Sequence, residues 1–224
     1  MQVARRTKVQ AEETRQQIIE AARSVFYRQG VNGSSLEMVA LEAGLTRGAI
    51  YWHFKDKADI FLAVRQSVLL PILAEIESIF VNEHYADPLD CIDAALRRFF
   101  QILQERPCVR MVLETITCRC EHVAEFADIQ SGFEWSPTDL LTRLESVYGA
   151  AAELGTLRPD LPPKAIARDT WAFFHGLVNR FLLCEANGKF RSQVFEMIAF
   201  HMALRRCGRR GDSSPVMGIG YAGG

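Results

Sequence analysis

The chain has 224 residues, of which 49% are hydrophobic and 24% are charged, so it can bury a core of useful size. No segment reaches the uninterrupted apolar length of about 18 residues that a membrane span needs. The N-terminus runs into Glu12 and Glu13 without an apolar segment, which argues against a signal peptide. We therefore expect a cytoplasmic protein with no membrane partner.

The net charge of −1 hides an uneven distribution along the chain. Residues 1–65 contain ten Lys or Arg and seven Asp or Glu, a balance of +3, whereas the remainder contains sixteen and twenty, a balance of −4. A basic N-terminal region joined to an acidic body is typical of a DNA-binding module attached to a domain with another role.

Helical periodicity dominates and strand patterns are nearly absent, so the sequence predicts an all-α protein. The first helix is expected from Ala11 to Gln29. Ser34, as N-cap, and Glu37 form a capping-box pattern at the start of a short second helix. Thr46 is placed to cap a third helix of about two turns, from Arg47 to His53.

Longer helices are expected after this point. The fourth begins after Asp56 and runs to about Phe80, and Pro71 inside it predicts a kink or break. Asp87-Pro88 begins the fifth, with the proline at the first helical position. The other helices are expected over residues 107–118, 121–132, 137–155, 164–186 and 191–206. The chain thus divides into an N-terminal domain (1–56), a body (57–206) and a Gly- and Ser-rich tail (207–224) expected to be disordered.

Two short helices joined at Gly44 fit a helix-turn-helix, in which the second helix enters the major groove of DNA. Ile50 and Phe54 fall on its inner face. A basic and aromatic outer face, too polar for a core, is formed by Arg47, Tyr51, Trp52 and His53. Spacing alone leaves open that Tyr51 and Trp52 only cover the three-helix core.

Residues 45–57, Leu-Thr-Arg-Gly-Ala-Ile-Tyr-Trp-His-Phe-Lys-Asp-Lys, closely resemble the signature of the TetR family of transcriptional regulators. The resemblance extends back through Phe26 and Gly30-Val31 to Arg5-Arg6, and it is dense over residues 5–65. Within the family this region is most similar to the repressors of multidrug efflux pumps, the AcrR and TtgR type. Further along, Glu114 and Cys118-Arg119-Cys120-Glu121 match a stretch of those repressors.

The resemblance implies a set of DNA-binding residues. Arg47 is expected to reach base edges, and Trp52 to pack on the backbone or a thymine methyl. Phosphate contacts are expected from Tyr51, His53, Lys57 and from the hydroxyl and amide of Ser35. A flexible basic arm is expected to touch phosphate or enter the minor groove, and it contains Arg5, Arg6 and Lys8. Thr46 and Gly48 complete the expected surface.

Dimerisation is expected because helix-turn-helix proteins generally bind two half-sites. The last two helices carry more apolar residues than one protomer should need, and in the resembled family these helices form a four-helix bundle between protomers. The residues expected at this homodimer interface are Phe173, Leu177, Phe181, Phe195, Ile198 and Met202.

Large apolar residues in the middle helices fit either a plain core or an effector pocket. The resemblance favours the pocket and implies that it is lined by Phe99, Leu113, Glu114, Leu140, Leu144, Trp171, Phe174, His175 and Val178. Glu114 and His175 are the expected polar anchors. His175 stands where some relatives have an acidic residue, which puts a preference for cationic ligands in doubt.

Six cysteines are interpreted as reduced, mostly buried thiols. Cys118-x-Cys120 with His122 lacks the ligand spacing of a structural zinc site, so no metal is expected. No cofactor is expected either, because the chain shows no phosphate-binding loop or catalytic constellation.

The sequence therefore predicts a ligand-responsive repressor that binds palindromic operator DNA as a dimer and is released by small hydrophobic compounds, controlling an efflux operon. The alternative is a TetR-type repressor or activator of a non-efflux pathway with a metabolite ligand. A non-specific DNA-coating protein is disfavoured by the acidic body, and an enzyme by the missing catalytic groups.

Overall fold

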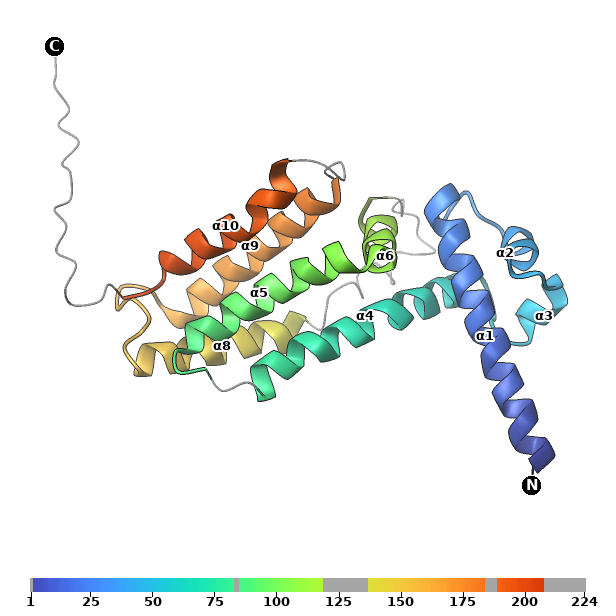
Figure 1. Cartoon of the computed structure of the whole chain (residues 1–224), viewed down its shortest axis with the longest axis horizontal. Coiled ribbons are helices and arrows are strands. Elements are labelled where there is room, and N and C mark those ends of the chain that lie inside the picture. The colour runs from blue at the N-terminus through green and yellow to red at the C-terminus, as the bar shows by residue number, and fades with distance from the viewer. Residues whose placement is uncertain (1, 83–84, 119–136, 184–188, 208–224) are drawn as a thin grey trace, which may run out of the picture.

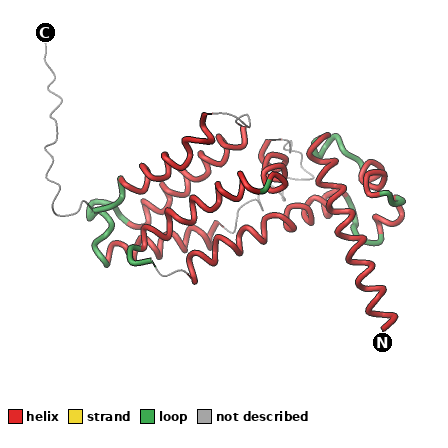
Figure 2. The backbone as a smooth tube through the Cα atoms, viewed as in Figure 1, coloured by secondary structure: helices red, strands yellow, loops and turns green. Residues whose placement is uncertain are grey.

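The computed structural model describes residues 2–82, 85–118, 137–183 and 189–207. Every named secondary-structure element in these ranges is a helix, as Figure 2 shows. The all-α prediction is therefore confirmed. Figure 1 shows a small head of three helices at one end, joined by a long helix to a bundle that we call the body. The described helices are α1 (Gln2–Gln29), α2 (Leu36–Ala43), α3 (Arg47–Tyr51), α4 (Lys57–Asn82), α5 (Pro88–Glu105), α6 (Pro107–Cys118), α8 (Pro137–Glu153), α9 (Pro163–Leu183) and α10 (Lys189–Ala203).

Helix α1 begins much earlier than expected. Residues 2–10 contain neither Gly nor Pro and include Ala, Arg, Lys and Gln, which favour helix, so the helix continues to the N-terminus. Arg5, Arg6 and Lys8 therefore lie in α1, and the prediction of a flexible arm is wrong. Figure 1 shows the N-terminal part of α1 extending beyond the rest of the head.

Local capping fixes the two short helices of the head. Ser35, not Ser34, is the N-cap of α2, and its hydroxyl accepts a hydrogen bond of 3.3 Å from the Met38 amide. Ser34 instead donates to the Val31 carbonyl at 2.6 Å. Gly44 ends α2 with a positive φ of 65°, which glycine adopts without strain. Thr46 caps α3 as predicted, accepting from the Ala49 amide at 3.2 Å.

The head packs on α4 through a shared apolar core. Ile18, Phe26, Ile50 and Phe54 are all buried, and the rings of Phe26 and Phe61 meet edge to face with centroids 5.9 Å apart. Asp56 caps α4 as predicted, accepting from the Asp59 amide at 2.8 Å. Helix α4 continues through Pro71, so of the predicted kink or break the break is wrong and the kink stays a prediction. It thus forms one uninterrupted connection between head and body.

Helix α5 lies inside the body between α4, α8 and α10. Its start follows the prediction, with Asp87 accepting from the Leu89 amide at 2.9 Å and Pro88 in the first turn. Phe100 is fully buried, with ring centroids 5.6 Å from Phe99 and 5.4 Å from Phe181 of α9. α5 therefore positions the aromatic centre of the body.

The far end of the body is closed by a contact that the sequence did not reveal. Leu157 and Arg206 form an isolated antiparallel bridge, and the Arg206 guanidinium contacts the carboxylates of Asp87 and Asp90 at the start of α5. The predicted helix over residues 121–132 lies outside the described residues, as does the tail beyond Cys207. Among the described helices, none is long and apolar enough to cross a membrane.

Candidate DNA-binding surface and effector cavity

The outer face of α3 and the turn after it are exposed. Trp52 leaves 89% of its surface accessible and Tyr51 49%, although both are large aromatic residues. Ile50 and Phe54 between them are buried, as predicted. Helix α3 ends at Tyr51, two residues before the predicted end, so Trp52 and His53 lie in the following turn. Because Trp52 covers nothing, the interpretation that it only shields the core is not supported.

Arg47 is held by two neighbours at the start of α3. Its guanidinium donates to the Tyr51 hydroxyl at 2.9 Å, lies 5.5 Å from the centre of that ring, and forms an ion pair with Glu37 of α2. The hydrogen bond to Tyr51 and then the charge of Glu37 raise the pKa of Arg47. The Arg47 side chain leaves 56% of its surface accessible at the start of α3, the helix that meets base edges in a helix-turn-helix.

The other residues expected at DNA surround α3. Lys57 donates to the Ser34 carbonyl at 3.2 Å, which brings its ammonium beside the start of α2 and Ser35. Gly48 is exposed, and a Cβ there would meet only the Thr46 hydroxyl, at 3.8 Å. Packing within the chain therefore does not require this glycine, which fits a close approach of another molecule.

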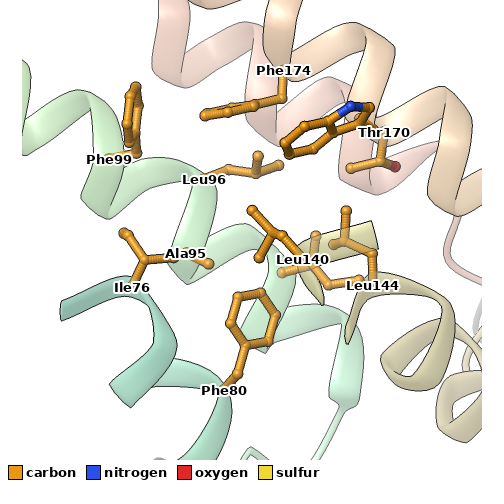
Figure 3. A pocket seen from close by; sticks show the side chains of 11 residues that line it. Ile76, Phe80, Ala95, Leu96, Phe99, Leu140, Leu144, Thr170 and Phe174 are labelled. Carbon is orange, nitrogen blue, oxygen red and sulfur yellow. The ribbon is translucent and has the colours of Figure 1, made fainter. Parts of the chain in front are cut away.

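A small cavity lies between α4, α5, α8 and α9 (Figure 3). Its lining comprises Ile76, Phe80, Ile92, Ala95, Leu96, Phe99, Leu140, Leu144, Thr170, Trp171 and Phe174. The Phe99 and Phe174 rings meet edge to face with centroids 4.9 Å apart, and the Trp171 ring lies 5.9 Å from Phe174. The cavity volume is about 30 Å³, the scale of a few water molecules rather than of a drug-sized ligand.

Five predicted pocket residues therefore line this cavity: Phe99, Leu140, Leu144, Trp171 and Phe174. Leu113, Glu114, His175 and Val178 do not. Leu113 is buried in the apolar core, and Glu114 pairs with Arg110 at 3.3 Å. Sequence reasoning missed the contributions of α4 and of Ile92, Ala95 and Leu96, although their spacing before Phe99 marks one face of a helix.

His175 has an unusual environment beside the cavity. Its ring centroid lies 4.3 Å from that of Trp171, and its Nε2 is buried without a hydrogen-bond partner among the described residues. Burial lowers the pKa of His175, which favours the neutral ring. It is a polar group that has a free bonding position next to an apolar space.

Most of the residues predicted at the dimer interface are used inside the protomer. Leu177, Phe181, Ile198 and Met202 are buried, and Phe173 and Phe195 are half-buried. For the four buried residues the prediction chose the inner face, because α9 and α10 are apolar on more than one side, and for Phe173 and Phe195 it stays a prediction. The large apolar residues that these helices expose are Leu183, Met197 and Phe200, and Leu204 is exposed in the turn after α10.

Metal ligation finds no support among the described residues, which contain no group of three His, Cys, Asp or Glu able to hold an ion. The side chains of Cys118 to His122 lie outside the described part. Of the described cysteines, Cys91 is buried, Cys108 half-buried and Cys207 exposed, so Cys207 is an exception to the expectation of mostly buried thiols.

An exposed, basic helix-turn-helix on one end of an all-helical body with an apolar cavity defines the class of a DNA-binding regulator. Comparison with known proteins agrees. The family described as "Bacterial regulatory proteins, tetR family" matches residues 18–64. The chain is 30% identical over 204 residues to the transcriptional regulator AcrR of Shigella flexneri, covering 90% of this chain and 94% of AcrR.

Two solved structures extend the likeness to the body. NalD of Pseudomonas aeruginosa, the secondary repressor of the MexAB-OprM multidrug efflux pump, has a TM-score of 0.74 at 27% identity, over 88% of this chain and 97% of NalD. The SmeT–triclosan complex has a TM-score of 0.73 at 27% identity, over 88% of this chain and 93% of SmeT. The chain belongs to the tetR family of bacterial transcriptional regulators.

Proposed function

We propose that this regulator binds palindromic operator DNA as a homodimer, represses a multidrug efflux operon and is released by a small hydrophobic compound. The observation that carries the proposal is the exposed Arg47–Tyr51–Trp52 surface on a short, capped helix. Arg47 reads bases, while Tyr51, His53, Lys57, Thr46 and the start of α2 at Ser35 contact phosphates. Arg5, Arg6 and Lys8 add phosphate contacts from the helical N-terminus of α1, and Gly48 lets the backbone approach.

The dimer forms through the exposed faces of α9 and α10. Phe200 on α10 and Leu204 in the turn that follows the helix leave 67% and 50% of their surface accessible, and Met197 lies one turn before Phe200. Small residues on the exposed side of α9, Ala172 and Gly176, allow a second copy to approach closely. When these two helices of each copy pack together, they form a four-helix contact. The resulting dimer presents two recognition helices, one for each DNA half-site.

The effector enters the body at the cavity under Phe99, Trp171 and Phe174. Its walls accept an apolar aromatic compound, and His175 supplies a neutral hydrogen-bonding group beside Trp171. A ligand of ordinary size needs the lining to move, because pockets for such ligands hold roughly 300–1,000 Å³. The SmeT–triclosan complex supports a halogenated phenol as a first probe.

The test begins with duplexes selected from a random pool by the purified protein. Specific duplexes should bind at least ~10³-fold more tightly than scrambled ones at physiological salt. Arg47→Ala should weaken binding to the selected duplex by about 1–3 kcal/mol and relax the base preference at one position per half-site. Lys57→Ala should weaken binding to every duplex and lower the slope of log affinity against log salt concentration by roughly 1. Equal affinity for selected and scrambled DNA contradicts the proposal.

The efflux assignment and the effector are tested together. Triclosan and other hydrophobic antibacterials are titrated by calorimetry, and operator binding is measured with each compound that binds. Release of the operator by pump substrates supports the proposal. Release only by a metabolite of another pathway favours the second candidate, a tetR-family regulator of a non-efflux pathway.

A further inference from the structure

A chain of buried polar groups lies directly behind the cavity wall. The Tyr148 hydroxyl of α8 is 2.7 Å from the Thr170 hydroxyl of α9, which is 3.2 Å from Nε2 of His201 on α10. All three residues are buried, and Thr170 and Tyr148 are fully so. Three helices of the body therefore meet at the one hydroxyl of Thr170.

Thr170 has two different faces. It is the one hydroxyl residue among the residues that line the cavity. Figure 3 shows its oxygen on the side away from the cavity and a carbon of its side chain toward it. The apolar part of Thr170 thus faces the cavity, while its hydroxyl bonds Tyr148 and His201.

His201 is held tightly in this arrangement. The Phe173 ring stacks on it with centroids 3.6 Å apart and planes inclined by 8°, and Arg205 donates to the His201 carbonyl and pairs with Asp169. Burial and the charge of Arg205 lower the pKa of His201 to about 3, so the ring is neutral at neutral pH. A neutral ring has one nitrogen lone pair to accept and one N–H to donate.

His201 also adjoins the exposed face of α10. Phe200 precedes it directly and Leu204 follows three residues later, so a rotation or shift of α10 at His201 moves both exposed residues. The hydrogen bond between Thr170 and His201 therefore joins the cavity wall to the helix that carries the proposed dimer face.

We propose that Thr170 is the positioning residue through which filling of the cavity changes the orientation of α10. A group larger than the cavity pushes the wall of α9 outward, the Thr170 hydroxyl leaves His201, and α10 loses the contact that fixes its exposed face. This inference rests on the proposed function, in which that face sets the spacing of two recognition helices. It names the regulation of the effector site rather than the effector.

The first test fills the cavity without any ligand. Figure 3 shows Leu144 pointing toward Thr170 from α8, and the wider, rigid ring introduced by Leu144→Phe takes up most of the cavity and presses on its wall. Leu144→Met conserves volume and is the matched control. Selected-duplex affinity should fall by about 5–150-fold for Leu144→Phe, the usual size of a coupling, and by less than about 2-fold for Leu144→Met.

The second test removes the hydrogen bonds and leaves the shape. Thr170→Val keeps a methyl toward the cavity and loses both bonds, whereas Thr170→Ser keeps the hydroxyl. In the Thr170→Val background, Leu144→Phe should cause no further loss of DNA affinity. In the Thr170→Ser background, Leu144→Phe should lower DNA affinity as it does in the wild type. Equal losses from Leu144→Phe in the wild-type and Thr170→Val backgrounds overturn the proposal.

A readout without DNA separates this inference from the proposed function. The ¹⁵N resonance of His201 Nε2 should shift in Leu144→Phe and stay unchanged in Leu144→Met, because only the former breaks its bond to Thr170. An unchanged resonance in a folded Leu144→Phe protein overturns the inference whether or not DNA binds. If Leu144→Phe does not fold, it is replaced by Ile92→Phe, at another residue that lines the cavity, with the same expected shift. Absence of sequence-specific DNA binding by the wild type, with the His201 shift present, overturns only the proposed function.

Discussion

The head and the body place their aromatic residues in opposite ways. In the head, Tyr51 at the end of α3 and Trp52 in the turn after it are exposed, while Ile50 of the same helix is buried, so the surface is formed before any partner arrives. In the body, Phe99 and Phe174 are buried against each other around a cavity of about 30 Å³. The head can therefore bind as it stands, whereas the body must rearrange to bind. This difference is what a switch requires, because an effector acts only if it favours one arrangement over another.

The largest effect is expected where the body meets a second copy of the chain. Phe200→Glu places a charge on the proposed dimer face without disturbing the core, because Phe200 is exposed in the protomer. The variant should sediment as a monomer and bind the selected duplex at least ~10³-fold more weakly, because one half-site contact is lost. Leu154→Glu, at an exposed leucine at the end of α8, is the control and should remain dimeric. A dimeric Phe200→Glu protein would show that the interface lies elsewhere.

The same comparison separates what the sequence reveals from what it does not. The head is specified by signals a few residues apart, such as Thr46 capping α3 and Gly44 ending α2, and these were predicted with an error of one residue at Ser34. The dimer face depends on which side of α9 and α10 faces the rest of the body. Both helices have several apolar sides, so periodicity alone could not tell buried Ile198 from exposed Phe200.

The cavity shows an intermediate case. The aromatic wall formed by Phe99, Trp171 and Phe174 was predicted through the family resemblance. The contribution of α4, through Ile76 and Phe80, depends on a contact between distant parts of the chain and was missed. Glu114 was chosen because it is polar in an apolar stretch, yet the structure gives it a local partner in Arg110. Polarity within an apolar segment therefore does not by itself indicate a ligand.

A pair of substitutions tests the head–body contrast directly. Phe99→Ala removes a buried ring from the body and should lower the free energy of unfolding by about 3–5 kcal/mol. Trp52→Ala removes an exposed ring and should change it by less than about 0.5 kcal/mol, while it weakens DNA binding. Urea unfolding and DNA titration measure both quantities. Strong destabilisation by Trp52→Ala would mean that this ring is part of the core of the head.

Acid should affect the body through His201. Its folded pKa of about 3 lies below the ordinary value of 6.5, so the unfolded chain binds more protons between these values and stability falls as the pH decreases through that window. The slope is at most about 1.4 kcal/mol per pH unit. His201→Asn should flatten the decrease measured by urea unfolding between pH 6.5 and 4. His53→Asn, in the head, is the control, and an unchanged slope in His201→Asn would contradict the assignment.

The smallest effect is expected at Glu37, beside Arg47, the residue proposed to contact bases. Its carboxylate forms an ion pair with Arg47, and both side chains are more than half exposed, so the pair contributes little to folding. On DNA the same negative charge lies near phosphates and competes for the Arg47 cation. Glu37→Gln should therefore strengthen binding to selected and scrambled duplexes alike by roughly 2–5-fold at low salt, with the gain shrinking as salt screens the charges. Weaker binding to the selected duplex alone would instead show that Glu37 orients Arg47 for base contact.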